Sequence, residues 1–87
     1  MNYRFPIDPD WSTDEMVDVV EFLDLVERAY YQSVDSNQLL SHYKKFKQVV
    51  PSKSEEKKLS QAFERDSGCS VYRTVKKAQE NESVKMK

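Results

Sequence analysis

Apolar residues recur at helical spacing in four segments of this chain, separated by short polar stretches. The broadest apolar stripe runs over residues 13–31, a second covers 36–50, and thinner stripes cover 53–67 and 71–79. Residues three and four apart lie on the same side of an α-helix, so each stripe can face a common core. The chain has one glycine, too few for the many tight turns of a β-sheet protein. The pattern predicts an all-α fold, a compact array of four helices in a single domain over residues 1–87.

Polar residues at the start of each stripe support these boundaries. Ser12 and Ser52 are each followed three residues later by glutamate, which is the spacing of a capping box. Asp35 and Ser70 occupy the corresponding positions before the second and fourth stripes. Gly68 follows the third stripe, where glycine commonly ends a helix in the left-handed conformation. Each predicted helix therefore carries its own start signal.

The two ends of the chain do not follow the helical pattern. Tyr3 and Phe5 alternate with polar residues, and two prolines exclude a helix there. We expect residues 1–11 to form an extended N-terminal arm that lays its apolar side chains across the helices. Residues 80–87 are polar, and we expect them to form a frayed tail.

Four carboxylates lie close together before and within the first predicted helical turn: Asp8, Asp10, Asp14 and Glu15. They invite interpretation as a metal or acid–base site. However, Glu15 completes the capping box with Ser12, and acids in a first turn interact favourably with the positive end of the helix dipole. We therefore interpret this cluster as the start of a helix.

Three residues bear on which side of a predicted helix faces the core. Two lie in the stripe over residues 13–31 and do not fit its pattern, and one lies in the stripe over 71–79. Glu27 falls inside the apolar arc, which predicts an ion pair at its edge with a lysine of a later helix. Leu25 falls on the acidic arc, which predicts an exposed leucine; alternatively, Leu25 marks a contact patch together with Val17. In the stripe over 71–79, Tyr72 is expected on the buried side with Val71, Val75 and Ala78.

The length of the chain bears on its stability, and its cysteine content bears on the cellular compartment in which it works. A chain of 87 residues buries only about 60–65% of the surface that its unfolded form exposes, so a partner would add useful stability. The single cysteine, Cys69, cannot form an internal disulfide, which is typical of an intracellular protein. We find neither a signal-peptide pattern nor an apolar run of membrane-spanning length. We therefore expect a cytoplasmic protein with no membrane contact.

The formal net charge of −1 conceals a strong asymmetry between the two parts of the chain. Residues 1–35 carry nine acids and two bases, whereas residues 36–87 carry twelve bases and six acids. The two parts either attract each other within one fold or present charged surfaces to a partner. Both interpretations stay open at the level of sequence.

The side chains that usually carry catalysis are scarce in this chain. There is no glycine-rich phosphate loop, and the single His42 and single Cys69 leave too few ligands for a transition-metal site. Cys69 precedes a helix start and is the one candidate nucleophile; its alternative role is a small packing residue at a helix junction. His42 is expected to be a half-buried packing residue. We therefore predict no enzymatic activity, cofactor, metal or small-molecule substrate.

Lysines in the second part of the chain raise the alternative of nucleic-acid binding. Lys44, Lys45, Lys57 and Lys58 belong to a series of bases that could contact phosphates without sequence specificity. The sequence pI of about 5.8 and the interspersed glutamates instead favour a solvated charged face.

Three runs of sequence point to a family. The segments NYRFPIDPDWSTDE, VVPSKSEEKKL and SGCSVYRTVKKA resemble the small uncharacterised YktA-like family of Bacillus-type bacteria. The resemblance extends from Asn2 to about Ala78. It implies an all-helical fold and a cytoplasmic bacterial setting, but no activity and no site residues.

We conclude from the sequence that the chain is a small cytoplasmic protein-interaction or structural module. Its partner is an unidentified protein or a second copy of the chain, and non-specific nucleic-acid binding through the basic second half is the alternative. The candidate interaction surface consists of Tyr3, Phe5, Trp11, Val17, Leu25, Lys44, Lys45, Lys57 and Lys58.

Overall fold

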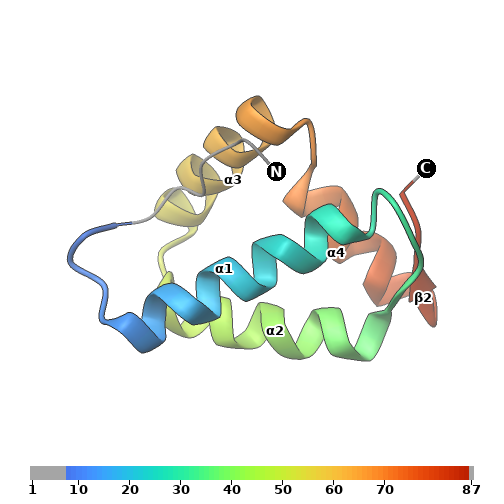
Figure 1. The fold of residues 1–87 in the computed structure, drawn as a ribbon, viewed down its shortest axis with the longest axis horizontal. Helices are drawn as coiled ribbons and strands as arrows, with labels where there is room; N and C mark the ends of the chain where they lie inside the picture. The colour runs from blue at the N-terminus through green and yellow to red at the C-terminus, as the bar shows by residue number, and fades with distance from the viewer. Residues whose placement is uncertain (1–7, 87) are drawn as a thin grey trace.

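Four helices make up most of the part of the chain that the structure, a computed structural model, describes, which is residues 8–86 (Figure 1). The all-α array predicted from the sequence is confirmed. Within the described residues, no helix has both the length and the apolar character needed to cross a membrane. The elements are α1 (Thr13–Arg28), β1 (Val34–Asp35), α2 (Ser36–Val49), α3 (Lys53–Ser67), α4 (Val71–Glu80) and β2 (Ser83–Val84).

Each predicted helix start has the expected capping residue, but of the two predicted capping boxes only the one at Ser12 forms both of its hydrogen bonds among the described residues. At α1 the Ser12 hydroxyl accepts a hydrogen bond from the Glu15 N–H at 3.2 Å, and the Glu15 carboxylate accepts one from the Ser12 N–H at 2.8 Å. This reciprocal pair is a complete capping box and satisfies two backbone donors that the helix leaves without partners. The other three helices start at side-chain caps from Asp35, Ser52 and Ser70.

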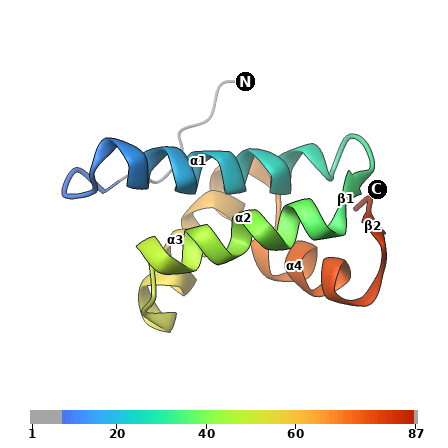
Figure 2. The same ribbon diagram turned by 90° about the horizontal axis from the view of Figure 1, so that it is seen from below.

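Helices α1 and α2 run in opposite directions side by side and form the main packing unit (Figures 1 and 2). Their interface centres on Phe22 and Phe46, which are fully buried and stacked with ring centroids 4.8 Å apart. The Tyr43 ring lies 5.4 Å from that of Phe22. Aromatic pairs at these distances contribute attraction beyond the burial of their surface.

Helices α3 and α4 complete the array, and α4 buries Val71, Thr74, Val75 and Ala78. Only Leu59 and Phe63 are buried on α3, which agrees with the thin stripe in its sequence. Gly68, with φ of 76°, ends α3 in the left-handed conformation that glycine adopts without a steric penalty. The Tyr30 hydroxyl accepts a hydrogen bond from the Ser70 N–H at 2.8 Å, which ties the α3–α4 junction to the end of α1.

The prediction of a frayed tail over residues 80–87 is wrong for the described residues. Strand β2 pairs with β1 in antiparallel register, with Val84 opposite Val34. Val84 is fully buried, and the Met86 N–H donates to the carbonyl of Ala29 at 2.7 Å. Val84, together with Met86 that packs against the core, and a few backbone hydrogen bonds order this otherwise polar segment.

The predicted N-terminal arm falls largely outside the described residues. Tyr3 and Phe5 belong to residues 1–7, which the structure does not describe. Residues 8–11 form a turn rather than an extended strand: the Trp11 N–H donates to the Asp8 carbonyl at 3.1 Å, and the Asp10 N–H donates to the Asp8 carboxylate at 2.9 Å. Asp8 is thus a turn residue, and Glu15 is a cap. Half of the opening acid cluster therefore has a structural role.

Candidate functional site

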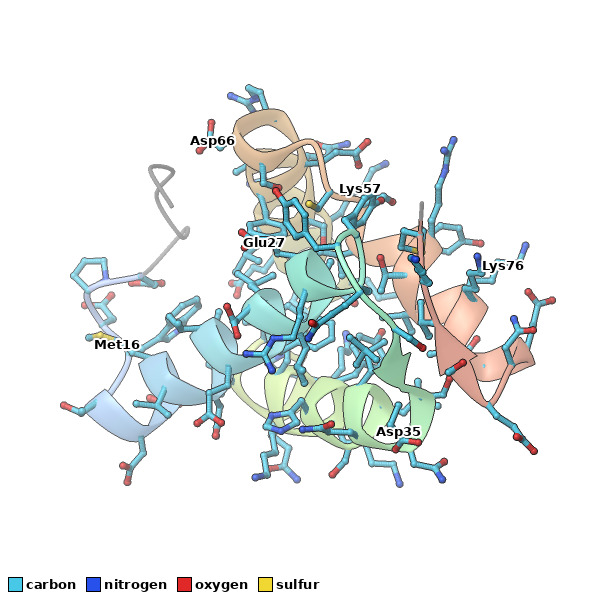
Figure 3. All side chains as sticks on the ribbon, turned by 45° about the vertical axis from the view of Figure 1, so that its right-hand side comes forward. Met16, Glu27, Asp35, Lys57, Asp66 and Lys76 are labelled. Carbon is cyan, nitrogen blue, oxygen red and sulfur yellow. The ribbon has the colours of Figure 1, made fainter. Side chains whose placement is uncertain are left out.

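A groove of about 590 Å³ lies between α2, α3 and α4. Val71 and Val75 of α4 provide apolar lining, and the Tyr72 ring stands beside them with 72% of the residue exposed. Lysines from both neighbouring helices complete the groove. Lys53 and Lys57 come from α3 and Lys76 from α4; Figure 3 labels two of them, Lys57 and Lys76. We call this feature the basic groove.

Helix α2 forms one wall of the basic groove, and a short polar network connects this wall to α3. The Tyr43 hydroxyl donates to Glu56 Oε2 at 2.9 Å, and Lys47 Nζ donates to Glu56 Oε1 at 2.6 Å. Burial, followed by the hydrogen bond to Glu56 and its negative charge, raises the pKa of Tyr43 to about 12. Tyr43 is protonated at neutral pH, as it would be at its ordinary pKa of 10, and the network links α2 to α3 at this wall of the groove.

The charge of the basic groove is positive once these contacts are counted. Two carboxylates line it, but Glu56 is already paired with Lys47, so only Glu64 opposes the three lysines of the groove. Within residues 8–86, Lys53, Lys57 and Lys76 form no ion pair. The groove thus combines an apolar floor, one exposed aromatic ring and three lysines that form no ion pair with a described acid.

The position of Tyr72 on α4 differs from the prediction. Tyr72 was expected on the buried side of the fourth helix, but it is mostly exposed, and Thr74 is buried instead. Successive residues turn by about 100° around a helix, so Tyr72 lies about 100° from Val71 and away from the stripe. Thr74 is satisfied there because its hydroxyl donates to the Ser70 carbonyl at 2.6 Å.

A second surface of interest lies on the outer side of α1. Asp14, Val17, Asp18 and Glu21 follow the spacing i, i+3, i+4, i+7, so they share one side of the helix. Val17 is 45% exposed, as its predicted contact role requires. No residue of α1 lines the basic groove. We call these four residues the acidic stripe.

Leu25, predicted to be exposed next to Val17, is in fact buried with 5% exposure. It borders a small depression together with Gln38 and His42, so α2 covers this flank of α1. The predicted patch of Leu25 and Val17 is therefore wrong, and Val17 alone remains at the surface. His42 is half-buried, as expected, and its Nδ1 has no hydrogen-bond partner within the described residues.

Two further residues singled out in the sequence are buried. Glu27 has 4% exposure, and among residues 8–86 it has no ion pair with a lysine, contrary to expectation. Burial raises the pKa of the Glu27 carboxyl because it penalises the charged form. Cys69 is also buried, and its Sγ donates to the Ser67 carbonyl at 3.7 Å. Its position at the α3–α4 junction favours the packing role.

The candidate lysines of the sequence divide between the groove and the rest of the surface. Lys57 lines the basic groove, whereas Lys44, Lys45 and Lys58 are exposed but do not line it. Trp11 is half-buried against the core. No cluster of three or more His, Cys, Asp or Glu within residues 8–86 could hold a metal ion. Our predictions of no metal and no enzymatic activity stay predictions.

Ion pairs between the described residues do not join the two oppositely charged parts of the chain. Arg28 pairs with Asp24 at 2.7 Å, within the acidic first part, and Lys47 pairs with Glu56 at 2.6 Å, within the basic second part. The attraction between the two parts, which the sequence left open, is thus not realised as an ion pair in residues 8–86.

Comparisons with known proteins identify the family. The model of an uncharacterised protein family, UPF0223, matches residues 2–87. A UPF0223 protein of Oceanobacillus iheyensis is 55% identical over 84 residues, covering 95% of this chain and 96% of the relative. One from Streptococcus uberis is 53% identical, covering 93% and 88%. The UPF0223 protein YktA of Bacillus subtilis is 48% identical, covering 100% and 99%, which confirms the resemblance drawn from the sequence. The chain therefore belongs to the uncharacterised protein family UPF0223.

Proposed function

We propose that this protein is a small protein-interaction module of the bacterial cytoplasm and that it binds its partner in the basic groove. The exposed Tyr72 ring carries this proposal. A tyrosine with 72% exposure beside the apolar Val71 and Val75 is poorly explained by folding, because it buries little surface within the chain. Tyrosines in such settings frequently anchor protein interfaces.

The shape and lining of the groove favour a peptide segment as its occupant. It lies between helices, has an apolar floor and carries long lysine side chains on two sides. A helix or extended segment can lay an apolar side chain on the floor while its acids meet the lysines. The single, buried Cys69 supports the cytoplasmic setting.

One observation favours nucleic-acid binding as a second candidate function. An exposed aromatic ring next to lysines is also the arrangement on which single-stranded nucleic acids stack. The carboxylate of Glu64 in the groove, and the position of Lys44, Lys45 and Lys58 outside it, argue for a protein partner instead.

A capture experiment with matched variants tests this proposal. The tagged protein would be incubated with a bacterial lysate, with and without nuclease, in three forms: wild type, Tyr72→Ala and Tyr31→Ala. Tyr31 is 71% exposed but does not line the groove, so it controls for the loss of an exposed ring. We expect a nuclease-resistant partner that wild type and Tyr31→Ala retain and Tyr72→Ala loses. Equal capture by both variants would contradict the proposed site, and capture that disappears with nuclease would favour the nucleic-acid alternative.

A further inference from the structure

The fold leaves two surfaces of opposite charge without partners. The acidic stripe of α1 carries Asp14, Asp18 and Glu21, and none of these acids forms an ion pair with a described residue. The three lysines of the basic groove likewise form no ion pair with a described residue. Like charges held together on a surface repel one another, so each group gains from a counter-charge brought by a partner.

The exposed apolar residues coincide with these two surfaces. Val17, Tyr31 and Tyr72 are the exposed large hydrophobic residues among those the structure describes. Val17 belongs to the acidic stripe, and Tyr72 belongs to the basic groove. Each charged surface therefore has an apolar contact point of its own. Tyr31 lies apart from both, in the turn that follows α1.

The two surfaces also match in form. The acidic stripe follows one side of a helix over about two turns, which is roughly 10 Å in length. The basic groove lies between helices and has lysines on α3 and on α4. A helix that lays Val17 against the Tyr72 ring would bring its acids next to lysines on both sides of the groove, which is the arrangement of a helix bound in a groove.

A single molecule cannot make this contact with itself. No residue of α1 lines the basic groove. Figure 3 shows Met16, next to Val17 near the start of α1, on the opposite side of the molecule from Lys76 on α4. The complementary surfaces can meet only when they belong to different molecules.

We propose that the acidic stripe of one copy of this protein docks into the basic groove of a second copy. This inference rests on the proposed function, because it assigns an occupant to the same groove. The contact joins two different surfaces, so each pair retains one free stripe and one free groove. Association of this heterologous type continues into open chains or closes into a ring.

The contact is small and charged, which determines how it should behave. An interface of one helix face and one groove lies at the weak, transient end of protein associations. Its attraction should fall as salt shortens the Debye length from about 30 Å at 0.01 M to about 3 Å at 1 M. We therefore expect reversible self-association that is strong at low ionic strength and largely lost at high ionic strength.

Sedimentation of the purified protein with charge-reversal variants tests the proposal. The groove variant carries Lys57→Glu and Lys76→Glu, and the stripe variant carries Asp18→Lys and Glu21→Lys. A control with Lys44→Glu and Lys45→Glu has the same net charge as the groove variant but leaves the groove intact. At low ionic strength we expect wild type and control to self-associate, and each of the other two variants to associate at least about tenfold more weakly, because attractive charge pairs become repulsive.

Mixing the two variants gives the sharpest readout. The reversed groove is acidic and the reversed stripe is basic, so the groove of each variant matches the stripe of the other. We expect an equimolar mixture to regain association that neither variant shows alone. Circular dichroism of each variant confirms that the helices remain folded. A structural defect could not be repaired by mixing, so rescue shows that complementary charge, rather than misfolding, controls the association.

Other outcomes separate this inference from the proposed function. A wild-type protein that stays monomeric at low ionic strength overturns the self-association, as does association that the groove variant leaves unchanged. If capture from the lysate still depends on Tyr72 in that case, the interaction module stands and the groove takes a segment of another protein. If neither self-association nor Tyr72-dependent capture occurs, both proposals are wrong.

Discussion

Helices α1 and α2 differ from α3 and α4 in how completely their side chains are used by the fold. In the α1–α2 pair, Phe22 stacks on Phe46, and both rings are fully buried. On α3 only Leu59 and Phe63 are buried, and on α4 a large ring, Tyr72, remains in solvent. Most large apolar side chains of the first region have a packing partner, and Val17, which is 45% exposed, is the exception. Val17 on α1 and Tyr72 on α4 are the side chains that packing within the fold does not explain, and we assign both to binding.

The largest expected effect tests the packed region. Phe46→Ala removes a fully buried ring that stacks on Phe22 and should lower the free energy of unfolding by about 3–5 kcal/mol. In a chain of this size, such a loss approaches the whole stability. Chemical denaturation measures it, with Tyr72→Ala as the control from the other region, expected to change stability by less than about 0.5 kcal/mol. Equal losses would remove the distinction between the two regions.

The next effect concerns the strand pair that closes the packed region. Val84→Ala should cost about 1–3 kcal/mol, because Val84 is fully buried opposite Val34. Hydrogen exchange at the Ser36 and Met86 amides should accelerate in the variant, since both donate across this junction. Lys85→Ala is the matched control, because Lys85 is exposed. Unchanged stability in Val84→Ala would mean that the tail is dispensable for folding.

A comparison of two caps sharpens the contrast between regions. Ser12→Ala removes one half of a reciprocal capping box and should cost about 0.5–2 kcal/mol. Ser52→Ala at α3 should cost less, because its single hydrogen bond from the Glu55 N–H is long at 3.5 Å. Thermal unfolding of both variants gives the order, and the reverse order would contradict our account of α3 as the less constrained helix.

Glu27 is a buried carboxyl among the apolar side chains of α1, and the pH dependence of stability should reveal the cost of burying its charge. Its folded-state pKa is raised from the ordinary value of 4.5, so the unfolded chain ionises first and stability falls as the pH rises through the folded-state pKa. Glu27→Gln cannot ionise, so it removes this loss and should be more stable than the wild type at pH 7. Below the ordinary value the gain should shrink, because the carboxyl is then protonated in both states. A gain that does not depend on pH would point to another cause.

The smallest effect concerns the wall of the groove. The pKa of Tyr43 is raised to about 12, so its contribution to stability is present below the ordinary value of 10 and is lost as the pH rises through 12. Tyr43→Phe should cost about 1 kcal/mol at pH 7, through loss of the hydrogen bond to Glu56. The variant should also lose less stability than the wild type between pH 10 and 12. Parallel curves for the two proteins would show that Tyr43 does not titrate in this way.

The sequence was sufficient for the helices because each carries local signals. The caps at Ser12, Asp35, Ser52 and Ser70 depend on residues within one turn, and all four form. The first helix was extended too far, to Tyr31, because its apolar periodicity continues into the turn that follows Arg28. The paired strands could not be predicted, since two residues on each side carry no pattern of their own.

The surfaces were harder to predict because exposure depends on neighbours that are distant in sequence. Leu25 was assigned to the outside of its helix, but α2 covers that flank. Lys53, Lys57 and Lys76 all belong to the basic series of the sequence, but their grouping with Tyr72 was missed. Helices α3 and α4 bring these residues together only in three dimensions. One local signal was available: Tyr72 lies off its stripe and one turn from Lys76.

The pairing of β1 with β2 has a consequence for the protein while it is being made. Helices α1 and α2 are neighbours in sequence, and contacts of that kind form early in folding. Val34, by contrast, gains its strand partner only when Val84, fifty positions later, reaches it. Until then Val34 lacks this pairing, and the amide of Ser36 lacks its acceptor, the carbonyl of Glu82. An unpaired strand edge of this kind is open to aggregation and to cellular proteases until the last strand is added.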